Sequence, residues 1–199
     1  MTRYTGPKDR LSRREGVDLF GKGAKLTRLN ITPGQHGPKG SRGMSQFGRQ
    51  LREKQKVKRM YGIMESQFRI YVGKALKSKG NTGEALLVLL EKRLDNVVNR
   101  LGFAPSRPMA RQVVSHRHVF VDGKKVNIAS YNVKVGQTVS IGSKAQEIPA
   151  VKKALLDKEY ILPKWLERKA IVGRISKEPT RTDIVEPVSE QDIVEFYSR

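Results

Sequence analysis

The sequence predicts an α+β protein with an extended basic N-terminal arm, a helical domain, and an inserted small domain of two helices followed by hairpins. Three observations predict this fold class. Residues 1–43 are rich in glycine, proline, lysine and arginine and poor in apolar residues. Apolar residues then recur at helical spacing over residues 45–101, and the period changes to two around Asp122-Gly123.

The composition indicates a polyanionic partner. Forty lysines and arginines stand against 19 acidic residues, which gives a net charge of +21. An isolated fold repels itself at that charge, so nucleic acid is the first interpretation and an anionic membrane surface is the rival. The sequence has no apolar run of the roughly 18 residues that a membrane span needs, and its start has no apolar signal segment. We therefore expect a soluble protein of the cytoplasm or of an organellar matrix, without a membrane partner.

The positive charge is concentrated in two blocks. Residues 1–60 carry a net charge of +12 and residues 92–150 carry +7, whereas residues 61–91 and 151–199 carry +1 each. Two basic blocks with nearly neutral spacers predict two contact surfaces on one long polyanion.

The arm, residues 1–43, has two interpretations. Its stretch "TPGQHGPKGSRG" at residues 32–43 consists of turn residues and cannot form a core. The arm is then either a disordered solubilising tail or a segment that becomes ordered on RNA. The stretch "GKGAK" at residues 21–25 lacks the spacing of a phosphate-binding loop, so we interpret it as an ordinary loop.

Residues 45–62 predict a long amphipathic helix. Its apolar side is made by Phe47, Leu51, Val57 and Tyr61. Another side carries basic residues at spacings of three and four, namely Arg49, Arg52, Lys56 and Arg59. Such a stripe is often only a solvated face. Because it continues a basic arm and has almost no acidic partner at i+4, we interpret it as a surface for RNA phosphates.

A second helix is predicted by an apolar stripe, with Gly80 at its C-terminal cap. The stripe consists of Met64, Phe68, Tyr71 with Val72, and Ala75. Its aromatic residues could serve as stacking platforms for bases, but their helical spacing favours packing in a core.

The small domain begins with helices and ends with strands. Asn81 or Thr82 can cap a helix whose period continues to Leu101, and Gly102 ends it. Ser106 is a candidate N-cap for a short helix through residues 110–114, with Pro108 in its first turn. Asp122-Gly123 then predicts a β-hairpin, and "YNVKVGQTVSI" at residues 131–141 predicts strand, turn and strand.

The remaining chain predicts a helix at residues 150–157, a strand and turn at residues 169–179, and a docked C-terminal end at residues 189–199. The expected domains are the arm at 1–43 and a helical domain at 44–91, on which residues 184–199 pack back. An RNA-binding domain at 92–155 and its extension at 156–183 complete the chain.

His116 and His118 form the motif His-x-His, which has several interpretations. A metal site would need further ligands, and the chain has no cysteine and only three histidines. A catalytic pair would need a nucleophile or a carboxylate, and Asp122 is better explained by its turn. One histidine could belong to the core. We favour a basic edge that contacts RNA, in which a regular strand would put the two histidines on one face.

The chain resembles a known family through several motifs. Residues 91–137 resemble the small RNA-binding domain named after small-subunit ribosomal protein S-four, which also occurs in pseudouridine synthases, tyrosyl-tRNA synthetases and heat-shock proteins. The flanking segments are similar to the bacterial-type ribosomal protein itself: "PGQHG" at 33–37, "QLREKQKVKRMYG" at 50–62, "ESQFRIYV" at 65–72 and "IVEFYSR" at 193–199. The resemblance covers nearly the whole chain.

This resemblance implies a non-enzymatic constituent of the small ribosomal subunit without a cofactor. Such a protein would bind small-subunit ribosomal RNA directly and early in assembly, at a multi-helix junction in the 5′ domain. It would also help form the channel through which messenger RNA enters, beside ribosomal proteins three and five, and support translational accuracy. Lys39 and Arg42 match the channel-lining stretch by position, and Ser106, Arg107 and Arg111 match the "SR…AR" element of the domain.

The sequence departs from the family pattern at two places. Many members carry a cysteine zinc knuckle in the arm, whereas this chain is similar to the zinc-free form. Arg117 stands where glycine is common between the two histidines. The alternatives are an RNA-modifying enzyme, for which about 50 residues after the hairpins leave too little room, and a free stress-related RNA-binding protein.

The residues expected to contact RNA come from the basic blocks and from the resemblance together. They are Arg3, Tyr4, Arg13, Arg14, Lys22, Gln35, His36, Lys39, Arg42, Arg49, Arg52, Lys54, Lys56, Arg59, Arg69, Lys92, Arg93, Arg100, Ser106, Arg107, Arg111, His116, Arg117, His118 and Lys124. No residue is expected to be catalytic or to bind a metal.

Overall fold

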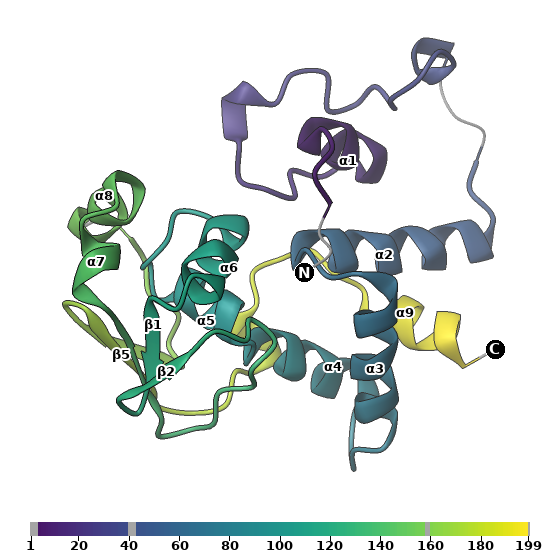
Figure 1. Cartoon of the computed structure of the whole chain (residues 1–199). Helices are drawn as coiled ribbons and strands as arrows, with labels where there is room; N and C mark the ends of the chain where they lie inside the picture. The colour runs from purple at the N-terminus through teal and green to yellow at the C-terminus, as the bar shows by residue number, and fades with distance from the viewer. Residues whose placement is uncertain (1–3, 40–42, 158–159, 199) are drawn as a thin grey trace. The chain divides into compact units, whose positions relative to one another are not determined.

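A computed structural model describes residues 4–39, 43–157 and 160–198 and confirms the α+β class. The chain forms two compact units, one made of Met1–Gly83 with Pro187–Arg199 and the other of Glu84–Glu186. Figure 1 shows the helices of the first unit and the mixed helices and strands of the second. The helix α4, Thr82–Glu91, contains the boundary between the units.

The arm contains a helix that the sequence did not predict. This helix, α1, spans Lys8–Glu15 and is followed by the short 3-10 helices η1, Gly23–Lys25, and η2, Gly37–Lys39. Its charged sequence shows no apolar stripe, and α1 is instead held by polar contacts and by its packing on α2. The Leu19 amide donates to Ser12 Oγ at 3.4 Å, and both residues are buried. Part of the arm is therefore folded onto α2 within the first unit.

The helical part of the first unit follows the expected apolar stripes in part, since Phe47 and Met64, the first residue of each stripe, are exposed. Helix α2 spans Gln46–Met60, and its N-cap Ser45 accepts a hydrogen bond from the Gly48 amide at 3.1 Å. Helix α3 spans Glu65–Leu76 and buries Phe68, Tyr71, Val72 and Ala75, which confirms their assignment to the core. The prediction of Gly80 as its cap was wrong, because α3 ends at Leu76 and Lys77 takes the cap position.

The C-terminal helix α9, Glu190–Tyr197, packs on α2. Gln50 Nε2 donates to Glu195 Oε2 at 2.6 Å, and the rings of Phe47 and Phe196 lie 5.6 Å apart. Ile193 is fully buried. These contacts confirm that the end of the chain is docked.

The helix that the sequence predicted from Asn81 or Thr82 to Leu101 is divided in the structure, because the extended backbone of Arg93 separates α4 from α5, Leu94–Arg100. Helix α6 spans Arg107–Ser115 with Ser106 at its N-cap and proline in its first turn. Strands β1, Val119–Val121, and β2, Lys124–Val126, form the expected hairpin. The turn has φ of 47° at Asp122 and 75° at Gly123, the positive values that a type I′ turn requires at both central residues.

Three further strands complete an antiparallel sheet with the order β2-β1-β3-β5-β4. Strand β3 spans Thr138–Ile141, and β4, Leu166–Lys169, forms a second hairpin with β5, Val172–Ile175. The sequence predicted β3 and β5 but not β4. The strand expected just before Gly136 was wrong, since only Asn132 pairs there, in an isolated bridge with Arg93.

The described helices of the second unit include α7, Ser143–Gln146, α8, Pro149–Leu156, and the 3-10 helix η3, Arg181–Asp183. Its core lies between α5, α6 and the sheet and contains the fully buried Leu101, Phe103, Val139 and Trp165. Among the described residues, no helix is both long and apolar enough to cross a membrane.

Candidate nucleic-acid interface

The basic residues of the arm divide into those that shape it and those that are exposed. Arg13 Nε donates to the carbonyl of Ile31 at 2.9 Å, and Arg13 Nη2 donates to that of Thr32 at 3.3 Å, so Arg13 ties α1 to the later part of the arm. Lys22 forms an ion pair with Asp9 at 2.5 Å. Of the residues expected to contact RNA, those exposed in the arm are Tyr4, Arg14, Lys22, Gln35, His36 and Lys39. Arg10 and Arg28 are exposed as well. Arg3 and Arg42 lie outside the described residues.

The stripe on α2 has acidic partners that spacing along the helix could not reveal. Glu15 at the end of α1 accepts hydrogen bonds from both Arg52 and Arg59. Lys56 pairs with Glu53 at 2.5 Å, and Arg49 lies 3.7 Å from Asp192 of α9. Arg49 is nevertheless well exposed. The stripe is therefore partly used to hold α1 and α9 on α2.

Lys54 belongs to an internal cluster. It is 5% exposed, donates to Glu65 Oε1 at 3.0 Å and lies 4.7 Å from the centre of the Phe196 ring. Burial raises the pKa of Glu65, but hydrogen bonds from Tyr197, Lys58 and Lys54 outweigh it and lower the pKa to about 2. The cluster joins α2, α3 and α9, and Lys54 is internally paired. Arg69 Nε lies 3.8 Å from Glu65 Oε1 as well, but the Arg69 side chain is 72% exposed.

Four arginines of the second unit that are expected to contact RNA each hold a carboxylate within the protein. Arg93 is 3% exposed and shares Asp95 with Arg111, at 2.8 and 2.7 Å. Arg100 binds Glu91 at 2.9 Å and Glu186 at 2.7 Å, and Arg107 binds Glu186 at 2.7 Å. Arg93 is thus an interior residue, whereas Arg100, Arg107 and Arg111 keep part of their surface.

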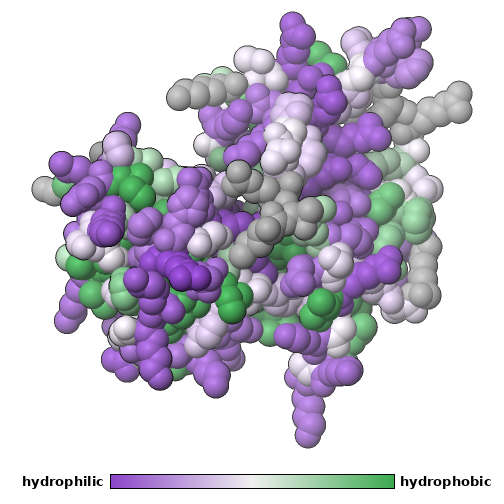
Figure 2. Space-filling model, in the orientation of Figure 1, coloured by the Kyte–Doolittle hydropathy of each residue, from purple (hydrophilic) through white to green (hydrophobic). Residues whose placement is uncertain are grey.

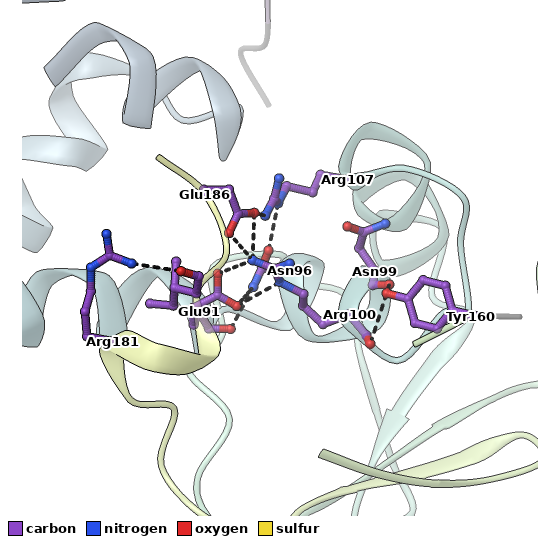
Figure 3. Close-up of polar contacts among 9 residues, drawn as sticks. Glu91, Asn96, Asn99, Arg100, Arg107, Tyr160, Arg181 and Glu186 are labelled. Atoms are coloured by element: carbon purple, nitrogen blue, oxygen red, sulfur yellow. Dashed lines mark hydrogen bonds and ion pairs between the residues drawn. The ribbon is translucent and has the colours of Figure 1, made fainter. Parts of the chain in front are cut away.

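Figure 3 shows how the network around Glu91 and Glu186 converges from separate segments. Asn96 Nδ2 donates to Glu91 Oε2 at 2.8 Å, and Arg107 Nε donates to Asn96 Oδ1 at 2.8 Å. Burial raises the pKa of Glu186, but the charges and hydrogen bonds of Arg100 and Arg107 lower it to about 2. The network therefore binds Glu186, at the end of this unit, to Arg100 of α5 and Arg107 of α6, and it stabilises the packing of these segments.

The opposite end of α6 carries an exposed basic group. His116 is the C-cap of α6, and the rings of His116 and His118 lie 6.3 Å apart. The strand alternation considered for this motif does not apply, because β1 starts only at Val119. Arg117 has a φ of 64°, in the left-handed region that glycine adopts without strain. Lys124 is exposed on β2, at the edge of the sheet.

Two other residues expected to contact RNA are only partly exposed. Lys92 pairs with Glu178 at 2.7 Å, and Ser106 is half-buried at the N-cap of α6.

Within the described ranges, no group of three or more histidines and carboxylates could hold a metal ion. In the view of Figure 2, hydrophilic residues cover much of the visible surface of both units.

Sequence reasoning missed Glu15. Its only signal was a lone acidic residue after "RLSRR", and its role depends on a contact with α2 across more than 35 residues of chain. It likewise missed Lys125, which is exposed beside Lys124 and lies 5.6 Å from the centre of the Phe120 ring.

Two protein families match consecutive parts of the chain. Residues 3–91 match the family described as "Ribosomal protein S4/S9 N-terminal domain", and residues 92–139 match the "S4 domain". The chain is also 49% identical to the small ribosomal subunit protein uS4 of Parabacteroides distasonis and 50% identical to that of Herminiimonas arsenicoxydans. Both alignments cover all of this chain and all of the relative. The chain belongs to the uS4 family.

Membership in the uS4 family confirms the resemblance seen in the sequence and assigns the chain a structural role in the small ribosomal subunit. The uS4 of Natranaerobius thermophilus, 49% identical over the full length of both proteins, carries the same name. Because uS4 proteins are structural and not enzymatic, the family excludes the RNA-modifying enzyme considered above.

Proposed function

We propose that the protein binds small-subunit ribosomal RNA directly and early in assembly, at a multi-helix junction of the 5′ domain. The observation that carries the proposal is the separation between internally paired and exposed cations. Several basic side chains hold carboxylates, while others are exposed in both basic blocks: Arg14, His36, Lys39, Arg49, His116, Arg117 and Lys124. Two exposed basic groups on separate units suit one long folded RNA.

The internal arginine networks support this function in a second way. Asp95, Glu91 and Glu186 fix the orientation of α5 and α6, and thereby fix where the exposed end of α6 presents His116 and Arg117. A rigid support reduces the entropy lost when the surface binds RNA. The small domain would then recognise the shape of the RNA backbone, and the arm and α2 would contact phosphates of a second region.

The finer assignments follow from the same proposal. In the cytoplasmic ribosome, or in that of an organelle, the protein would lie beside ribosomal proteins three and five and help form the channel through which messenger RNA enters. This position would support translational accuracy. Lys39 is exposed and suits the channel lining. The proposed division of labour is an arm at 1–43, a helical domain at 44–91 with 184–199, an RNA-binding domain at 92–155 and its extension at 156–183.

The experiment is binding of the purified full-length protein to a transcript of the 5′ domain, with an unrelated folded transcript of equal length as control. We expect preferential binding to the 5′ domain. Co-sedimentation adds a cellular arm, in which the protein should be stoichiometric in salt-washed small subunits. A protein found mainly free of subunits would favour the free RNA-binding alternative.

A further inference from the structure

We propose that Glu15 is a positioning residue that holds Arg52 and Arg59 together as a single phosphate-binding site for RNA. One backbone phosphate would be bound by the guanidinium donors that Glu15 leaves unused. The inference rests on the proposed function, since it names a site and a supporting residue for RNA binding by the arm and α2.

The geometry places the carboxylate beneath the two guanidinium groups. The Glu15 side chain is 0% exposed, whereas those of Arg52 and Arg59 are 24% and 23% exposed. Arg52 Nη1 lies 3.3 Å from Glu15 Oε1, and Arg59 Nη1 donates to the same oxygen. The two arginines are seven residues apart, about two turns of helix, so they leave α2 on the same face. A shared oxygen brings their guanidinium groups together.

Both guanidinium groups keep donors for a ligand. An arginine has five N–H donors. In the described parts of the chain, the hydrogen bonds and ion pairs of Arg52 and Arg59 go to Glu15 through Nη1. Nε and Nη2 of each residue therefore remain available at a partly exposed surface. Two guanidinium forks side by side match the geometry of one phosphate.

Burial works against the charges of this cluster. Burial raises the pKa of the Glu15 carboxyl, and the charges of Arg59, Arg52, Lys56 and Arg14 offset this effect only in part. Burial also lowers the pKa of Arg59, against the opposing charge of Glu15. Glu15 Oε2 is buried without a hydrogen-bond partner. A buried group of charges that folding disfavours is explained when a ligand uses it.

The local charge balance favours an anion. Four cations act on the single Glu15 carboxylate, so the cluster keeps an excess of positive charge. Tyr4 lies close enough to Arg59 to influence its pKa, and its ring is exposed, which suits stacking on a nucleotide next to the bound phosphate.

The test uses the full-length protein and the salt dependence of its binding to the 5′-domain transcript. If Arg52 and Arg59 share one phosphate, the double variant Arg52→Gln/Arg59→Gln should reduce the slope of log K against log salt by about 0.7 to 0.9. Each single variant should give most of that loss, because either change breaks the shared site. The control Lys77→Gln/Lys79→Gln removes two exposed charges of the same unit and should change the slope less.

Glu15→Ala should reduce the slope as the arginine variants do and should have no further effect in the Arg52→Gln/Arg59→Gln background. Glu15→Gln keeps an acceptor oxygen and should restore part of the slope that Glu15→Ala loses. Additive losses from the two single arginine variants, or an equal loss in the lysine control, would overturn the proposal even if Glu15→Ala does not fold.

Other results are equally decisive. Binding of anionic vesicles that the same arginine substitutions abolish, with RNA binding unchanged, would also overturn it. A wild-type protein that does not bind the 5′-domain transcript would refute the proposed function, whereas wild-type binding that the arginine and Glu15 substitutions leave unchanged would refute only this site.

Discussion

Arg117 offers a way to separate backbone strain from charge at the exposed end of α6. A non-glycine residue in the left-handed region costs roughly 1–2 kcal/mol, and glycine loses about 0.5–1 kcal/mol more backbone entropy on folding. The difference predicts that Arg117→Gly raises the free energy of unfolding by about 0.5–1 kcal/mol. Arg117→Ala keeps the strain at the φ of 64° and should leave this free energy within about 0.5 kcal/mol of the wild type.

Urea denaturation measures the stability, and filter binding to the 5′-domain transcript measures the function. Both variants lose the same charge, so both should weaken binding equally and reduce the salt slope by about 0.7 to 0.9. Gly123→Ala is the matched control of opposite sign, because it introduces a side chain at a φ of 75° and should destabilise the hairpin by about 0.5–1 kcal/mol by the same difference. If Arg117→Gly is no more stable than Arg117→Ala, the strain argument is refuted.

Three further predictions test the core packing at Gly173, the ion pairs of Glu186, and the expectation that the arm binds no zinc. A Cβ added at Gly173 would lie 2.4 Å from Leu101 Cδ2 in the core, so Gly173→Ala should lower the free energy of unfolding in urea by about 1–3 kcal/mol. Gly73 lies in α3 with open space around it, so Gly73→Ala should raise this free energy by up to about 1 kcal/mol. Equal effects of the two substitutions would contradict the packing of Gly173 against Leu101. The pKa of Glu186 is lowered to about 2, so its stabilisation is present above the unfolded pKa near 4.5 and is lost as the pH falls from about 5 to 2. The free energy of unfolding of Glu186→Gln should therefore fall by up to about 3 kcal/mol less than that of the wild type over this pH range. An unchanged pH profile would refute the stabilising role of the ion pairs of Glu186 with Arg100 and Arg107. A zinc-selective chelator should leave the circular dichroism spectrum and RNA binding intact, and a loss of either would revive a metal site.

The sequence predicted those elements that local signals determine. The hairpin at Asp122-Gly123 requires positive φ at two adjacent residues, and α6 is marked by its N-cap serine and early proline. The core positions of α3 followed from helical spacing alone. The ends of helices were harder to predict. Helix α3 ends at Leu76 and not at Gly80, because the residues between Leu76 and Thr82 form the loop that leads to α4.

Tertiary contacts explain what the sequence did not predict. Strand β4 has the polar sequence Leu166–Lys169 and exists because β5 pairs with it. Helix α1 has no apolar stripe and is tied to α2 by Glu15. The candidate interface was predicted as a set of basic residues, but charge alone cannot say that Arg93 and Lys54 are interior while Arg49 and Arg117 are exposed. Their partners lie on other elements, beyond the reach of spacing rules.

The most direct measurement is the affinity of the purified protein for the 5′-domain transcript as a function of salt concentration. Our account predicts that log K falls with log salt by several units per decade, and that the unrelated transcript binds more weakly at each salt concentration. A shallow slope with equal affinity for both transcripts, or no binding in dilute buffer, would contradict it.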